Sequence, residues 1–331
     1  MAARTALGRL FGRVRQSDLL WSFRSSKTTM VAGAVVGVMF LASFLAPWIA
    51  PQDPYDPASL NLSDAMKPPV FSDRGFWLCP GGYELREGAC AEEAKGSWQF
   101  PLGTDDQGRD LLSTILYGTR LSLVVGFASI ALAMVLGISL GLLSGYAGGA
   151  LDAFLMRLAD VQLTIPAILI ALTLDGIVRG IVSTQRHEEI ALFVIVFSIG
   201  LSLWVQFART VRGSVMVERT KDYVAAARII GVSSGGIMLR HILPNTLGPV
   251  FVISTINLAV AIITEATLSF LGVGLPPTQP SLGTLIRVGN DYLFSGEWWI
   301  TVMPGIALAV LILGVNLLGD WLRDALNPKL R

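Results

Sequence analysis

Residues 121–146 read LSLVVGFASIALAMVLGISLGLLSGY and contain no charged side chain. At about 1.5 Å of rise per residue, a helix of this length exceeds the roughly 30 Å of hydrocarbon in a lipid bilayer. A soluble helix would present a polar face to water, whereas this run has none. The segment therefore predicts a transmembrane helix and an integral membrane protein.

Further apolar runs lie on both sides of this segment, and they predict additional spans. Of the 331 residues, 53% are hydrophobic and only 15% are charged, against about 25% charged in an ordinary soluble domain. The sequence therefore predicts an all-α integral membrane protein of about six transmembrane helices. The other predicted spans are residues 30–49, 161–182, 190–207, 247–275 and 298–319, with 147–160 as a short connector.

Residues 1–29 are polar and basic, with Asp18 as their only acid, and the first span follows at 30–50. A cleaved signal peptide is the competing interpretation. The basic region is long, however, and prolines rather than a small-residue cleavage motif follow the apolar run. We therefore interpret the first run as a retained transmembrane helix.

Lys and Arg residues gather on one side of these spans, which predicts orientation. Placing both termini in the cytoplasm puts most of the 25 Lys and Arg residues inside, and leaves an acidic external loop at 51–118. Cys79 and Cys90 fall in that loop. In an oxidising compartment we expect them to form a disulfide, the alternative being two free thiols.

The polar stretch between the fourth and fifth spans is too apolar for a solvated tail. Residues 222–231 (DYVAAARIIG) predict a short helix, capped by Asp or Thr, that stops at Gly231. Ser233 or Ser234 is a candidate cap for a second short helix before Leu243-Pro244. Two such helices could dock in a cleft of another protein or lie among lipid headgroups, and the residues alone favour neither.

A specific resemblance appears here. Ala225-Ala226-Ala227, with Gly231 and Leu243-Pro244 at their spacing, resembles the EAA loop of bacterial ABC importer permeases. The loop's leading Glu is Ala225 in this chain, and His241 replaces an apolar residue. The resemblance implies that residues 219–244 couple to ATPase subunits. The residues implicated are Tyr223, Ala225, Ala226, Ala227, Arg228, Gly231, Leu243 and Pro244.

Other segments narrow the resemblance to the C-type permeases of the dipeptide/oligopeptide/nickel group. Residues 66–98 are longer than expected for that group and unmatched. The matching segments are residues 46–55, 102–110 (LGTDDQGRD), 117–123 (YGTRLSL), 240–245 (RHILPN) and 265–274 (EATLSFLGVG).

The resemblance implies an ABC type I importer permease fold, with a core at 119–331, in the bacterial inner membrane. It implies half of a translocation path for peptides or similar small solutes, nickel included. The implied partners are a homologous B-type permease, membrane lipid, two ABC ATPase subunits or domains on the coupling loop, and a solute-binding protein on external loops 51–118 and 276–297. The chain needs no cofactor of its own, because the ATPases bind ATP and Mg.

Several polar residues near the spans have two interpretations. Glu265 lies within a predicted span, where an acid is costly unless paired or hydrated. It either lines the translocation path or has a structural role, capping a helix break or pairing with Arg120 or Arg109. Asp105, Arg109 and Asp110 either bind a metal or substrate or, as we favour, form a hydrogen-bonded turn before the second span.

Other function classes are disfavoured. The sequence contains no Gly-Lys dipeptide and hence no P-loop, so the chain is not the ATPase. Residues 231–235 match G-x-S-x-G, but a helix precedes them rather than a strand, which argues against a hydrolase.

His187 and His241 are predicted on opposite sides of the membrane and cannot share a metal. A self-sufficient channel or secondary transporter would show internal repeats and more intramembrane charges than Glu265 and Asp175. Nothing points to nucleic acid.

Overall fold

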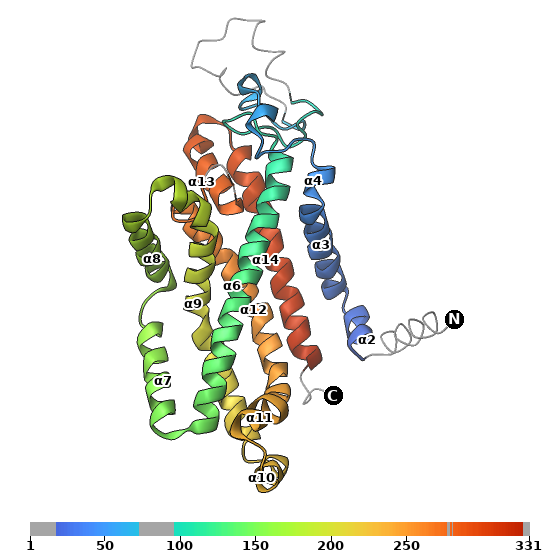
Figure 1. The fold of residues 1–331 in the computed structure, drawn as a ribbon. Helices are drawn as coiled ribbons and strands as arrows, with labels where there is room; N and C mark the ends of the chain where they lie inside the picture. The colour runs from blue at the N-terminus through green and yellow to red at the C-terminus, as the bar shows by residue number, and fades with distance from the viewer. Residues whose placement is uncertain (1–17, 73–95, 277–278, 280, 327–331) are drawn as a thin grey trace, which may run out of the picture.

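A computed structural model describes residues 18–72, 96–276, 279 and 281–326, and these residues form helices and connecting segments without a strand. The long helices run side by side as a bundle (Figure 1). The helices are α2 (Asp18–Ser25), α3 (Lys27–Phe44), α4 (Ala46–Ile49), α6 (Leu111–Ala147), α7 (Gly149–Leu163), α8 (Ala167–Ile181), α9 (Thr184–Glu218), α10 (Asp222–Ile229), α11 (Ser234–Gly236), α12 (Leu243–Phe270), α13 (Leu282–Tyr292) and α14 (Trp299–Leu326).

Within the described residues, five helices are long and apolar enough to cross a membrane, or six if the bent pair α7–α8 forms one span. The prediction of an all-helical membrane protein with about six spans is confirmed. The third span differs from its prediction. Residues 147–160 are not a connector, because α7 occupies most of them and meets α8 at an angle of 88°. Pro166, which cannot continue a helix ladder, stands at this break.

The centre of the bundle is the contact between α6 and α9, which glycines bring close together. A Cβ atom added to Gly137 would lie 2.3 Å from the Cβ of Phe207, and one added to Gly141 would lie 2.5 Å from the carbonyl oxygen of Ala208. One turn further on, Gly145 faces Val215 in the same way. Small residues at four-residue spacing let two membrane helices pack backbone to backbone.

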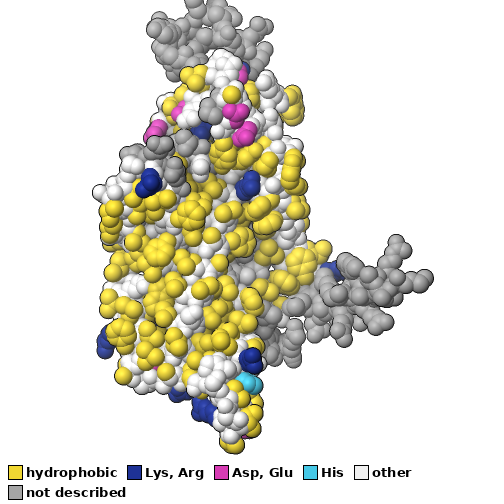
Figure 2. Space-filling view, in the orientation of Figure 1, with side chains coloured by type: hydrophobic (Ala, Val, Ile, Leu, Met, Phe, Trp, Pro, Cys, Tyr) yellow, Lys and Arg dark blue, Asp and Glu magenta, His cyan; other side chains and the backbone are white. Residues whose placement is uncertain are grey.

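The outer surface of the bundle is apolar. Large side chains such as Val38, Leu41 and Phe193 are more than half exposed. Figure 2 shows hydrophobic side chains over most of the visible flank, with charged side chains mainly toward its two ends. A surface of this kind is stable in lipid rather than in water.

The two ends of the bundle differ. At one end, residues 50–72 and 96–110 form an irregular cap over α13 and the start of α14 (Figure 1). At the other end α10 forms the tip, and α2 and the end of α14 lie toward the same end. The cap and the tip contain the residues that the sequence singles out.

Candidate functional site

The tip is built by α10 and the start of α12. As predicted, α10 stops at Gly231, whose φ of +81° suits glycine, and Val232 N–H then donates to Ala227 O at 3.0 Å. The predicted Asp or Thr cap is wrong: Lys221 is the N-cap and makes no side-chain hydrogen bond there. Asp222 is instead the first helical residue, where its negative charge interacts favourably with the positive end of the helix dipole.

The second predicted short helix is also wrong, because it continues into the membrane. Ser233 does act as a cap, accepting from Gly236 N–H at 3.3 Å. From there α11, a π-helical turn at Ile237–Ile242 and α12 follow without a break. Pro244 has no N–H to donate to the preceding turn, and Leu243 N–H reaches back five residues to Met238 O. A π-turn accommodates such a mismatch while keeping the helix continuous.

The outward side of this tip is made of small and apolar residues. Val224 and Ala227 are buried against the bundle, whereas Ala225 and Ala226 are exposed. Ile229 and Ile230 are 85% and 78% exposed. Of the other predicted coupling residues, Arg228 and Pro244 are exposed and Leu243 is half-buried.

Hydrogen bonds join the tip to both flanking helices. The Tyr223 hydroxyl donates to Glu218 at the end of α9 at 2.5 Å. The same oxygen accepts from Asn245 Nδ2 of α12 at 3.2 Å, and Asn245 also donates to His241 O at 2.8 Å. Burial and the Glu218 contact raise the pKa of Tyr223, so the phenol stays a donor. These hydrogen bonds therefore link α10 to both α9 and α12.

The tip also contacts the end of α6. The Arg228 guanidinium lies 5.5 Å from the ring centroid of Tyr146, and Arg219 Nη1 donates to Gly145 O at 2.9 Å. Nearby, Asp152 of α7 accepts from Arg212 Nε and Nη2 of α9 at 2.5 and 2.6 Å and from the Ser144 hydroxyl. This pair was not predicted from the sequence. The only signal in the sequence was an acid and a base in two polar segments. These segments are far apart in the sequence, so their contact could not be predicted.

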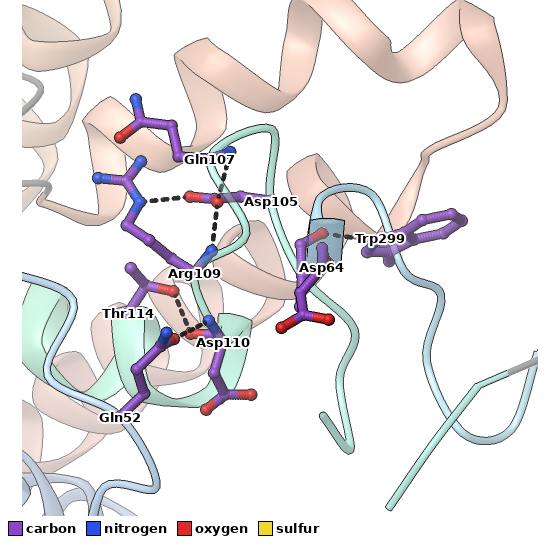
Figure 3. A network of polar contacts seen from close by, with 9 residues as sticks. Gln52, Asp64, Asp105, Gln107, Arg109, Asp110, Thr114 and Trp299 are labelled. Atoms are coloured by element: carbon purple, nitrogen blue, oxygen red, sulfur yellow. Dashed lines mark hydrogen bonds and ion pairs between the residues drawn. The ribbon is translucent and has the colours of Figure 1, made fainter. Parts of the chain in front are cut away.

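At the opposite end, Asp105, Arg109 and Asp110 form a turn before α6 (Figure 3). The Asp105 carboxylate accepts from Arg109 Nε at 2.5 Å and from the N–H groups of Gln107 and Arg109 at 2.9 Å. The side chains of Asp105 and Arg109 are 1% and 2% exposed. The two backbone N–H groups help to compensate the Asp105 carboxylate for its removal from water.

The turn is also tied to the helices around it. Asp110 caps α6 by accepting from Ser113 N–H at 2.8 Å, while Gln52 Oε1 accepts from Asp110 N–H at 2.6 Å. Trp299 Nε1 of α14 donates to Thr104 O at 3.1 Å. Burial raises the pKa of Asp110. No group of three or more His, Cys, Asp or Glu side chains suited to a metal occurs in the described ranges.

Glu265 is fully buried in α12. Its carboxylate accepts from the Ser122 hydroxyl of α6 at 2.7 Å and from the Ser269 hydroxyl at 2.8 Å. One of the predicted alternatives, pairing with Arg120 or Arg109, is not found in the described residues: Arg109 pairs with Asp105, and the Arg120 guanidinium lies over the Phe44 ring, 5.9 Å from its centroid. Cys79 and Cys90 lie outside the described residues, so their disulfide stays a prediction.

The chain is similar to known families of transport proteins. A family model described as "Binding-protein-dependent transport system inner membrane component" matches residues 137–331. A second model, "N-terminal TM domain of oligopeptide transport permease C", matches residues 17–69. Among solved structures, a chain of the MetNI methionine ABC transporter in an inward-facing conformation has a TM-score of 0.51 at 19% identity, covering 65% of this chain and 96% of that one. At that identity the likeness concerns the fold alone.

Relatives match over nearly their whole length. The dipeptide transport system permease protein DppC of Haemophilus influenzae is 37% identical, covering 90% of this chain and 91% of the relative. The di/tripeptide permease DppC of Pseudomonas aeruginosa is 35% identical, covering 90% and 89%. The oligopeptide permease OppC of Bacillus subtilis is 32% identical, covering 95% and 90%. The chain therefore belongs to the binding-protein-dependent transport system inner membrane components, in the group of peptide permeases that includes DppC and OppC.

Proposed function

We propose that this permease forms half of the translocation path of an ATP-driven importer for short peptides. The peptide substrate is inferred from the relatives, whose names specify dipeptides, di- and tripeptides or oligopeptides. The other half of the path is a homologous B-type permease, and an external solute-binding protein delivers substrate to the cap. Two ATPase subunits bind the ATP and Mg.

The main support for coupling to the ATPases is the exposed surface of the tip. It presents small side chains and two exposed isoleucines, a surface that excludes water when it enters a cleft. Its hydrogen bonds to α9 and α12 join it to two spans. Closure of the ATPases would shift α10, and α9 and α12 would move with it. The two states must differ in their contacts for ATP to drive this change.

We place the tip in the cytoplasm of a bacterium and the cap outside the inner membrane. The support is the distribution of charge: Arg209, Arg212, Arg219 and Lys221 lie toward the tip, and Asp53, Asp56 and Asp64 lie in the cap. Both termini then lie in the cytoplasm.

The test is to co-express the chain with the permease and ATPase genes beside it and to isolate the complex in mild detergent. We expect a second permease and ATPase subunits to co-purify. Ala226→Asp, which places a charge on the docking surface, should abolish transport-coupled ATPase activity. Ala150→Asp, at an exposed position at the start of α7, is the matched control and should retain it. A chain isolated without an ATPase would refute the importer and favour a self-sufficient channel or secondary transporter.

A further inference from the structure

A cavity lined by both polar and apolar side chains lies where the cap meets α6, apart from the buried turn and the tip. Its volume is about 470 Å³, within the range of small-ligand sites. Tyr55 of the cap and Tyr117, Arg120, Leu121 and Val124 of α6 line it, together with Gln279. Arg120 lies ten residues after Asp110, the residue that precedes the first turn of α6, and therefore about 15 Å along this helix of 37 residues. The cavity therefore lies near the cap end of the membrane span.

Arg120 has no carboxylate partner among the described residues, since no Asp or Glu oxygen there lies within 4.0 Å of it. Its contact is the Phe44 ring. It is nevertheless partly buried. Arg109, by contrast, is paired with Asp105. A cation withdrawn from water at the edge of a membrane is costly without an anion. Because Arg120 has no carboxylate partner among the described residues, its guanidinium can bind the carboxylate of a ligand.

The two tyrosines add donors to the same cavity. Their rings meet edge to face, with centroids 5.0 Å apart and an interplanar angle of 87°. In the described part of the chain neither hydroxyl has a hydrogen-bond partner. Burial is the main cause that raises the pKa of Tyr55 to about 12, so its phenol remains an O–H donor at any physiological pH. One acid is near: Asp53, whose carboxylate accepts from Tyr55 N–H at 3.0 Å.

We propose that this cavity binds the free carboxylate of the transported peptide as it enters the path. A guanidinium matches a carboxylate in a two-pronged hydrogen bond, and the tyrosine hydroxyls supply further donors. The ring faces with Leu121 and Val124 offer an apolar wall to a side chain of the peptide. This inference rests on the proposed peptide import and assigns a recognition step to the permease itself, separate from the binding protein.

The test measures equilibrium binding of a radiolabelled dipeptide to the purified complex, without the external binding protein. The same dipeptide with its C-terminus amidated is the ligand control. We expect Arg120→Gln to weaken binding of the acid form about 10-fold or more, and Arg120→Lys to weaken it less. Tyr55→Phe should weaken it a few-fold. Arg186→Gln, an exposed arginine at the start of α9, should change nothing. The amide should bind the wild type no better than the acid form binds Arg120→Gln.

Other results would overturn the inference. These are equal binding of acid and amide by the wild type, undetectable binding of the acid form, or equal loss of both forms in Arg120→Gln. If the wild type binds no dipeptide but binds a short-chain phosphatidylglycerol, used as a second labelled probe, and Arg120→Gln loses that binding, the cavity is a lipid phosphate site instead. ATP-driven uptake into proteoliposomes with the binding protein separates the two proposals. No uptake by the wild type refutes peptide import, whereas equal uptake by wild type and Arg120→Gln refutes only the cavity's role.

Discussion

At the scale of single residues, the cap is organised by one buried ion pair. Asp105 and Arg109 are almost fully enclosed, and the Asp105 carboxylate also holds two backbone N–H groups of its own turn. The sequence segment LGTDDQGRD predicted a hydrogen-bonded turn before the second span. It did not predict that Trp299, almost two hundred residues later, would anchor the turn, because a long-range contact leaves no local pattern.

Removing one partner of this buried pair should lower the free energy of unfolding more than removing one partner of an exposed pair. We expect Asp105→Ala to lower the free energy of unfolding by about 3–5 kcal/mol, because Arg109 would lose its carboxylate in a buried site. The measurement is thermal or denaturant unfolding of the purified chain in detergent. Asp64→Ala is the control: its pair with Lys67 is 22–32% exposed, and its loss should cost less than about 1 kcal/mol. Similar effects of the two changes would contradict this account.

Asp106, beside this pair, gives the cap a pH dependence. Burial, and then the charge of Asp105, raise its pKa above the ordinary 3.8. Its contribution to stability is therefore full below about pH 3.8 and is lost as the pH rises through the folded pKa. Asp106→Asn removes the charged form and should raise the unfolding midpoint at pH 7, with the gain vanishing toward pH 3.8. A gain that grows on acidification would have the wrong sign.

At the scale of helices, the apolar runs predicted the spans but not their ends. The uncharged run begins at Leu121, whereas α6 begins ten residues earlier, because hydropathy reports where a helix meets lipid and not where it starts. The same limit concealed the start of α7 and the continuity of α11 with α12. Glycine content alone also gave no hint of which glycines face α9.

The α6–α9 contact allows a direct test of close packing. Gly141→Ala would place a Cβ atom 2.5 Å from Ala208 O and 2.9 Å from the Val211 Cβ, and should destabilise the protein by about 1–3 kcal/mol. Gly213→Ala on α9 meets no atom within 4 Å. It should instead stabilise the helix by up to about 1 kcal/mol. Unfolding in detergent distinguishes these opposite signs.

At the scale of the whole molecule, the cap and the tip lie at opposite ends of the bundle, so any coupling must pass through the spans (Figure 1). Tyr223 is the point where the tip is joined to α9 and α12 together. Its assignment to a coupling loop is a prediction that rests on resemblance, whereas its partners Glu218 and Asn245 emerged only from the structure. Residues near in space but on different helices could not be paired from the sequence.

We expect Tyr223→Phe to leave the complex assembled but to lower peptide uptake per ATP hydrolysed by about 2- to 10-fold, corresponding to the loss of one or two hydrogen bonds. The measurement is uptake and ATP hydrolysis in the same proteoliposomes. Tyr146→Phe, which keeps the ring beneath Arg228, is the control and should retain the wild-type ratio. An unchanged ratio in Tyr223→Phe would remove the hydroxyl from the coupling route.

The buried contact between Glu265 and Ser122 has a consequence for biogenesis. A helix bearing a lone carboxylate partitions poorly into lipid, and part of the polar environment of Glu265 is supplied by α6, 143 residues earlier in the chain. Because ribosomes synthesise the chain from its N-terminus, α6 is already available when α12 leaves the insertion machinery. The helix that provides the hydrogen-bond donor is thus made before the helix that needs it, and a chain permuted to make α12 first would lack the Ser122 donor when Glu265 enters the membrane.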